Sequence, residues 1–267
     1  MKTRQPKRGL LLVLGFYAGL LLLWQGLGFF REALHLPPNY LFPTPWDVVH
    51  RLVELHRDGV LFPSIKTTLM RMGVGFCLSA AIGLCIGLAM GTNWAINRTL
   101  KSLFLGLQTL PTAAWVPISF MLFGWTDTGI YFVIIMSSTS AMAIATSDGI
   151  LNIPPIYLRA ARTLGTGPVA LYWRVIIPAA LPNIVTGLKL GWTLGWHGAV
   201  SAELIKNMIG LGWLLQMGRE LNDMPQVIGI MLVIIGFGLI LDQFLFGVIE
   251  RRIRRRWGLT AEEDLKR

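Results

Sequence analysis

Charged side chains are scarce in this sequence, and those present are unevenly placed. They make up 14% of the 267 residues, whereas soluble domains carry roughly 25%. Hydrophobic residues make up 54%, and long stretches hold no charge at all. A soluble core of this size would interleave charged with apolar residues. The composition therefore excludes an ordinary water-soluble domain and indicates that lipid surrounds the apolar stretches.

Cysteine and the motifs of catalytic sites are also sparse. The two cysteines, Cys77 and Cys85, lie in one apolar stretch and form neither a disulfide framework nor a metal-binding pattern. The sequence has no G-x-x-x-x-G-K-[ST] loop for nucleotide phosphates, no paired carboxylates and no nucleophile elbow. We therefore expect no catalytic site, metal or cofactor, and any ATP that drives this protein must be hydrolysed by a partner.

The net charge of +10 would suit a nucleic-acid-binding protein, but its placement argues against one. Basic residues crowd the two ends of the chain, directly beside apolar runs. Anionic lipid head groups lie at that position in a membrane protein. We therefore expect membrane lipids, and no nucleic acid, among the partners.

Uncharged runs long enough to cross a bilayer recur along the chain. A helix needs about 20 apolar residues to span the hydrocarbon core, and runs without alternation indicate helices rather than a barrel. We predict an all-α, polytopic membrane protein with about six transmembrane helices. The predicted spans are 10–30, 72–97, 102–126, 128–147, 175–202 and 224–241, the last resuming after Asp242. The first run is too long for a cleaved signal peptide and lacks a cleavage site, so we predict that it is retained.

Basic residues orient these spans. With an inner N-terminus, sixteen of the 24 Lys and Arg fall in inner segments, as the positive-inside rule requires. Both termini are then cytoplasmic. The predicted organisation is a cytoplasmic segment 1–9, a transmembrane domain 10–250 with an outer loop 31–65 and an inner loop 148–175, and a basic cytoplasmic tail 251–267.

The outer loop contains a helix signal of its own. Thr44 before Pro45 resembles an N-cap followed by proline at the first helical position. We predict a short amphipathic helix from Pro45 to about Arg57. Either it lies along the outer membrane surface or it is a simple connector. Its predicted apolar face consists of Trp46, Val49, Leu52 and Val53.

The inner loop carries the most informative segment. The Pro154-Pro155 pair favours a helix start, and Gly165 and Gly167 favour its end, so a helix over 156–164 is predicted. Its small residues leave a shallow surface with basic flanks, which suits the docking of another protein. The predicted docking residues are Arg159, Ala160, Ala161, Leu164 and Gly165.

This segment resembles the cytoplasmic coupling motif of ABC importer permeases. The family pattern is Glu-Ala-Ala, three residues, Gly, nine residues, then Ile-x-Leu-Pro. Here Arg159-Ala160-Ala161, Gly165 and the run ending in Pro178 keep that spacing, although Arg159 stands where the family usually has Glu. From about residue 24 to 257 the chain is similar to the branch that serves nitrate, sulfonate, taurine and bicarbonate. Counterparts occur at 41–45, 110–111, 123–124, 161–165, 181–182 and 210–212.

The resemblance implies a type I ABC importer permease in a bacterial inner membrane. It implies a cytoplasmic ATPase dimer, a periplasmic or lipoprotein solute-binding protein, and a second permease copy, identical or different. The solute would be small and mostly anionic, of the nitrate, sulfonate, taurine or bicarbonate type. The alternatives are a pyrimidine-like or vitamin-precursor solute moved by the same architecture, or a secondary transporter. A secondary transporter usually needs mid-membrane coupling carboxylates and an internal repeat, and the sequence shows neither.

Polar residues inside the spans are candidates for the translocation pathway. Pro111 frees a backbone carbonyl in the third span, and a broken span can offer polar groups to a solute or simply kink. Small hydroxylated residues in the fourth span either line the pathway or pack helices closely. Lys189 and His197 share one helix face that could attract an anion, unless Lys189 snorkels and His197 bonds between helices. The pathway candidates are Gln108, Thr109, Thr112, Ser137, Ser140 and His197.

Overall fold

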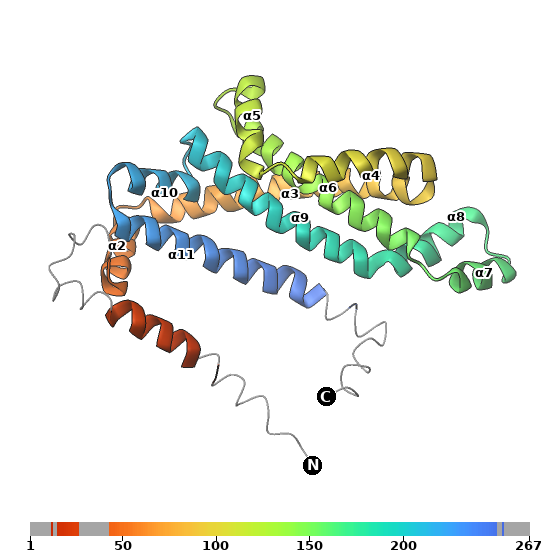
Figure 1. Ribbon diagram of the computed structural model, residues 1–267, viewed down its shortest axis with the longest axis horizontal. Coiled ribbons are helices and arrows are strands. Elements are labelled where there is room, and N and C mark those ends of the chain that lie inside the picture. The colour runs from red at the N-terminus through yellow and green to blue at the C-terminus, as the bar shows by residue number, and fades with distance from the viewer. Residues whose placement is uncertain (1–11, 13–14, 27–42, 250–252, 254–267) are drawn as a thin grey trace, which may run out of the picture.

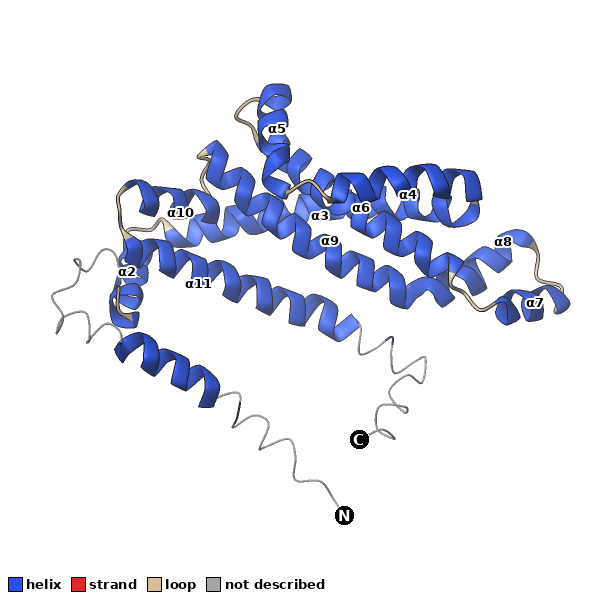
Figure 2. Cartoon of the chain, in the orientation of Figure 1, coloured by secondary structure: helices blue, strands red, loops and turns tan. Residues whose placement is uncertain are grey.

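The computed structural model describes residue 12 and residues 15–26, 43–249 and 253. The predicted all-α class is confirmed, because these residues form helices and short connections without a strand (Figure 2). After a helix at 15–26, the elements are α2 (Pro45–Arg57), α3 (Leu61–Thr92), α4 (Trp94–Gln108), η1 (Thr112–Ala114), α5 (Trp115–Phe123), α6 (Asp127–Leu151), α7 (Pro155–Thr163), α8 (Pro168–Leu171), η2 (Tyr172–Ile176), α9 (Ile177–Lys206), α10 (Leu211–Glu220), α11 (Met224–Leu241) and η3 (Asp242–Phe246).

Four continuous helices of the described chain are long and apolar enough to cross a membrane. They are α3, α6, the run Pro168–Lys206 that ends in α9, and the run Met224–Ile249 that begins with α11. The pair formed by α4 and η1–α5 would make a fifth crossing if it counts as one span. The predicted first span, 10–30, falls partly outside the described residues.

The third predicted span, 102–126, is not one straight helix. The chain bends by 94° between α4 and the η1–α5 segment. Pro111 has φ −62° and ψ 142°, an extended conformation. Proline donates no backbone hydrogen bond and pushes the residue before it out of the helical region. The break at Leu110-Pro111 therefore follows from the sequence, whereas the size of the bend does not.

The second predicted span begins earlier than expected. The prediction started at residue 72, but α3 begins at Leu61 and carries Lys66 and Arg71 within it. The predicted outer loop 31–65 therefore contains α2 and the first turn of α3. The charge of Arg71 misled the prediction, because carboxylates from distant parts of the chain neutralise it in the fold.

The centre of the bundle is α6, packed between α3 and α9 (Figure 1). Glycines on both neighbours permit this close approach. A Cβ on Gly87 of α3 would lie 2.6 Å from the Cβ of Thr146, and a Cβ on Gly187 of α9 would lie 2.5 Å from the Cβ of Ala145. Small residues let membrane helices pack closely, so these glycines fix α6 as the core.

The two ends of the bundle carry different elements. At one end lie α2, α10 and the start of α11, and at the other end lie α7 and α8 (Figure 1). The predicted α2 is confirmed with its bounds, and the Thr44 side chain caps it in a capping box with Asp47. Of its predicted apolar face, Trp46, Val49 and Val53 are exposed.

Candidate functional site

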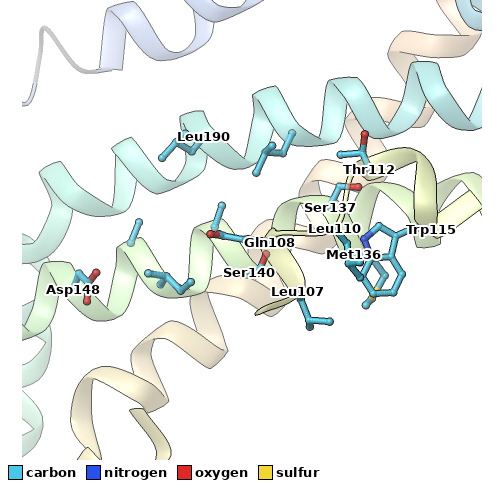
Figure 3. A pocket seen from close by; sticks show the side chains of 14 residues that line it. Leu107, Gln108, Leu110, Thr112, Trp115, Met136, Ser137, Ser140, Asp148 and Leu190 are labelled. Carbon is cyan, nitrogen blue, oxygen red and sulfur yellow. The ribbon is translucent and has the colours of Figure 1, made fainter. Parts of the chain in front are cut away.

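A cavity of about 450 Å³ lies at the bend between α4 and η1. Side chains from α4, η1, α5, α6 and α9 form its wall (Figure 3). Residues that are far apart in the sequence thus meet at one place, near the middle of the apolar helices. The lining residues are Leu107, Gln108, Leu110, Thr112, Trp115, Met136, Ser137, Ser140, Ala141, Ile144, Ala145, Asp148, Leu190 and Leu194.

Four of the six predicted pathway residues line this cavity together. Gln108 precedes the break and Thr112 follows it, and Ser137 and Ser140 belong to α6 (Figure 3). Sequence neighbours of the break and the serine run of the next helix are therefore brought together by the fold.

The other two candidates do not line the cavity. Thr109 is exposed, and its Oγ1 donates a hydrogen bond of 2.7 Å to the carbonyl oxygen of Gly106. His197 is exposed on α9. It belongs to a row of exposed residues along one face of α9 that consists of Asn183, Thr186, Leu190, Thr193 and His197. Because Leu190 lines the cavity, this row continues from the cavity toward the α10 end of the bundle.

The cavity offers hydrogen-bonding groups on a largely apolar wall. Its hydroxyls and the Gln108 amide can donate and accept hydrogen bonds. Ser137 already donates 2.7 Å to the carbonyl oxygen of Val133, which leaves its oxygen free to accept. Such a wall suits a small polar solute that passes through rather than one that is held tightly.

Sequence reasoning missed one pair at the cavity. Asp148 of α6 lines it, and Lys101 of α4 forms an ion pair of 2.5 Å with the Asp148 carboxylate. Both residues border uncharged runs in the sequence and were used only as the ends of spans. One turn earlier, Asn97 donates 2.7 Å to Ser147, so two polar contacts hold α4 on α6.

A buried polar cluster joins α3, α9 and α10 near the end opposite α7. Glu203 is fully buried, and its carboxylate accepts hydrogen bonds from Thr68, Arg71 and the backbone N–H of Gly212. Arg71 also pairs with Asp127 at 2.7 Å. The cluster neutralises charges that would be costly in an apolar bundle. Arg71 and Asp127 were taken only as span borders, and no local pattern shows that they meet Glu203.

The adjoining Lys206 holds the end of α5, the second helix of the bent segment. Lys206 is 1% exposed, and its Nζ donates 2.8 Å to the carbonyl oxygen of Gly124, directly after α5. A cation is favourable at the C-terminal end of a helix. Ser119 of α5 also donates 2.6 Å to the carbonyl oxygen of Gly129 in α6. These contacts fasten α5 to the α6–α9 core.

Another ion pair joins two of the long helical runs. Lys189 of α9 contacts Asp242 at 3.0 Å, where the π-helical turn η3 follows α11. Neither residue lines the cavity. The proposed solute-attracting role of Lys189 therefore gains no geometric support, and the pair instead ties the last helix to α9.

On α2, outside the spans, Arg51 links this helix to the start of α11. It contacts Glu54 at 2.9 Å and Asp223, which precedes α11, at 2.6 Å. Partial burial lowers the pKa of the Arg51 guanidinium, but the hydrogen bonds and charges of Glu54 and Asp223 outweigh it, so the pKa is raised. The guanidinium therefore stays charged at every physiological pH.

The predicted helix over 156–164 is present as α7, over Pro155–Thr163, and its docking role stays a prediction. It ends in a Schellman motif: the N–H of Thr166 bonds to the carbonyl of Ala161, and the N–H of Gly165 bonds to that of Arg162. Gly165 has φ +74°, which L residues rarely adopt. The helix end therefore depends on a glycine at this position.

The predicted docking residues differ in exposure. Arg159, Ala160 and Gly165 are exposed, and Leu164 is 84% exposed. Ala161, by contrast, is buried. Leu158 packs against a small core that joins the ends of α6 and α9. One face of α7 is thus rigidly seated on the bundle while the other is free.

Comparisons with known proteins agree with this architecture. The chain is 32% identical over 250 residues to the bicarbonate transport system permease protein CmpB of Synechococcus elongatus, covering 91% of this chain and 90% of that one. It is 30% identical over 220 residues to the nitrate import permease protein NrtB of Leptolyngbya laminosa, covering 81% and 78%.

Solved structures show the same fold at lower sequence identity. An inward-facing MetNI methionine ABC transporter matches with a TM-score of 0.62 and 19% identity, over 74% of this chain and 97% of that chain. An amino acid ABC transporter determined with histidines matches with a TM-score of 0.62 and 20% identity, over 75% and 97%.

Family membership follows from the sequence match. The binding-protein-dependent transport system inner membrane component family matches residues 81–255. Its members are transport subunits rather than enzymes, and they work with a separate ATPase and a solute-binding protein. The chain belongs to this family and is a membrane-embedded permease subunit of an ABC importer.

Proposed function

We propose that this permease forms the pathway of a small anionic solute of the nitrate or bicarbonate type. The observation that carries the proposal is the cavity at the break of the α4–α5 segment, where Gln108, Thr112, Ser137 and Ser140 converge. Relatives that share most of their length with this chain are named as bicarbonate and nitrate permeases. Neutral hydrogen-bond donors can bind a small anion without the deep trap that a fixed positive charge would create.

The pathway extends beyond the cavity in this proposal. The exposed row on α9 leads from Leu190 to His197, so His197 contacts the solute in the outer part of the route. Thr109 contributes from the bend itself. A second permease copy, identical or different, covers the exposed sides of α4, α5 and α9 and closes the route between the two chains.

The cytoplasmic side is the side of α7. The exposed face formed by Arg159, Ala160, Leu164 and Gly165 seats in a groove of the ATPase, while the buried Ala161 positions the helix. Both chain ends, 1–9 and 251–267, lie on this side, and the outer loop 31–65 faces the solute-binding protein. The span domain is 10–250, with 148–175 as the coupling loop.

The docking proposal is tested by co-purification with the ATPase. Ala160→Asp places a carboxylate on the exposed face, and Gly165→Ala strains the end of α7, because φ +74° disfavours any side chain by about 1–2 kcal/mol. Both variants should lose most of the bound ATPase while inserting normally into the membrane.

Gly167→Ala is the matched control. Gly167 lies two residues away, has φ −66°, and a Cβ there meets nothing within 4 Å. This variant should bind the ATPase like the wild type. Normal ATPase binding by Ala160→Asp and Gly165→Ala would refute the docking assignment.

The solute class is tested with the complete complex in proteoliposomes. ATP-dependent accumulation of radiolabelled nitrate or bicarbonate, and a loss of at least roughly tenfold for Ser140→Val, would support the proposal, because valine removes the hydroxyl and lines the cavity with hydrocarbon. Accumulation of a pyrimidine or vitamin precursor instead would reassign the solute. Accumulation without the ATPase would indicate a secondary transporter.

A further inference from the structure

The ion pair between Lys101 and Asp148 stands at one end of the cavity. Asp148 is the one charged residue among the described residues that line it. The carboxylate lies near the C-terminal end of α6, which leads directly into α7. In Figure 3 it lies apart from the labelled polar residues Gln108, Thr112, Ser137 and Ser140. Asp148 therefore marks the part of the cavity that adjoins the connection from α6 to α7.

Lys101 neutralises this carboxylate from across the helix contact. Its Nζ lies 2.5 Å from Asp148 Oδ1, and the two side chains are 34% and 38% exposed. A carboxylate this accessible is not needed to complete a buried core. Asn97 and Ser147, one turn earlier, already hold α4 on α6 with a hydrogen bond of 2.7 Å. The contact between α4 and α6 therefore does not depend on this pair alone.

A bare carboxylate at this place would oppose an anion strongly. Like charges a few ångströms apart repel, and the repulsion grows where less water screens them, as in a membrane interior. A cation would instead be attracted. The charge state of the pair thus decides which sign of solute can leave the cavity.

We propose that Lys101 is a specificity-determining residue that cancels the charge of Asp148 and so makes the inner end of the cavity passable for anions. This inference rests on the proposed anionic solute. It also explains how α4 contributes to selectivity although Gln108 and Lys101 lie two turns apart on it. Lys101 acts through Asp148 and needs no direct contact with the solute.

Uptake of radiolabelled nitrate and bicarbonate by the reconstituted complex tests the proposal with three variants. Lys101→Met leaves Asp148 uncancelled, and uptake should fall by at least roughly tenfold. Asp148→Asn leaves the positive charge of Lys101 uncancelled, so the effect should have the opposite sign: the KM for nitrate and bicarbonate should fall by at least roughly threefold, because the free ammonium attracts the anion. The double variant Lys101→Met with Asp148→Asn should recover the uptake that Lys101→Met alone loses.

The recovery separates a charge effect from a structural one. If the pair only held α4 on α6, all three variants would lose the same contact and the double variant would stay as poor as Lys101→Met. That result would overturn the inference, and so would wild-type uptake by Lys101→Met. The amount of folded complex, measured by size-exclusion chromatography, corrects each rate for expression.

The pair of Lys189 and Asp242 provides the matched control. It is also an ion pair between helices, at 3.0 Å and with side chains 41% and 30% exposed, but it does not line the cavity. If Lys189→Met lowers uptake, adding Asp242→Asn should therefore not restore it. If the wild-type complex takes up neither anion, the proposed solute itself fails. If the wild-type complex takes up these anions and Lys101→Met takes them up equally fast, only the present inference fails.

Discussion

The central helix α6 and the neighbouring α4 are both apolar, yet they are packed in opposite ways. In α6, 15 of 25 residues are buried, whereas Asn97 is the one buried residue among the 15 of α4. The glycines of α3 and α9 enclose α6, while α4 lies across one side of this core and is fastened to it by a few polar contacts. The following α5 is held by Lys206 and by Trp115 and Val116, which are buried in the core. The bundle thus divides into a close-packed core, formed by α3, α6 and α9, and an arm, formed by α4, η1 and α5, whose α4 part is largely exposed.

This division suits a transporter that must change shape. A close-packed core moves as one body, because tight interiors resist deformation. The α4 part of the arm, in which Asn97 is the one buried residue, can move relative to the core with few contacts to break. The cavity wall is accordingly shared: Ser137 and Ser140 belong to the core, and Gln108 and Thr112 belong to the arm or its bend. Substitutions in the two parts should therefore differ in kind.

The largest effect is expected at the buried cluster of the core. Glu203→Ala takes from Arg71 its buried partner, leaving the half-exposed Asp127, and removes an acceptor for Thr68 and Gly212. Breaking a buried pair from one side costs about 3–5 kcal/mol. We expect a clearly lower melting temperature of the detergent-purified protein, or loss of folded protein.

Asp127→Ala is the control for this prediction. Asp127 pairs with the same Arg71, but its side chain is 54% exposed. Exposed ion pairs contribute about 0–1 kcal/mol, so the melting temperature should barely change. Equal losses for both variants would contradict the distinction between the buried and the exposed partner.

Glycines in the core and in the arm should respond to alanine with opposite signs. A Cβ at Gly87 of α3 would lie 2.7 Å from the carbonyl oxygen of Ala143, which cannot move freely. Overpacking of this kind costs about 1–3 kcal/mol. A Cβ at Gly106 of α4 meets nothing within 4 Å, so alanine there should stabilise the helix by roughly 0.5–1 kcal/mol. Thermal unfolding of the two variants measures both effects.

A destabilised Gly106→Ala would show that the arm is packed in a way that the single chain does not reveal. The natural explanation would be contact with a second copy at α4. A stable Gly87→Ala would show that α3 and α6 can separate, and the proposed rigid core would then be wrong.

The local features of the fold could be predicted from the sequence. Thr44 and Pro45 mark the start of α2, and the Pro154-Pro155 pair and Gly165 bracket α7, because caps and breakers act within a few residues. The pathway serines and the polar residues at the break also met in one cavity. For the caps and breakers, the signal and its consequence lie in the same short segment. For the cavity, the sequence predicted the residues, and the fold brings their separate helices together.

The features that depend on distant partners could not be predicted. Arg71 ended a predicted span because its partner Glu203 lies 132 residues away. Lys189 and His197 share a helix face by spacing, but spacing does not say which neighbour that face meets. In the fold Lys189 meets Asp242, and His197 stays exposed. The 94° bend likewise depends on how α5 packs on α6 and not on Pro111 alone.

The smallest effect on stability is expected for Lys206→Met, which should instead change local hydrogen exchange in α5. The ammonium is 1% exposed and contacts the carbonyl of Gly124, so methionine removes a costly buried charge together with one hydrogen bond. Replacing a buried charge with an apolar side chain of similar size is often close to neutral, so the melting temperature should shift little. The end of α5 loses its fastening to α9, however, and backbone amides of residues 115–124 should exchange with deuterium several-fold faster, since local opening needs fewer contacts to break.

Lys66→Met, at an exposed position of α3, should leave that exchange unchanged. Unaltered exchange in α5 of Lys206→Met would mean that Ser119 and the apolar contacts of α5 hold the arm by themselves, and the arm would then belong to the rigid core.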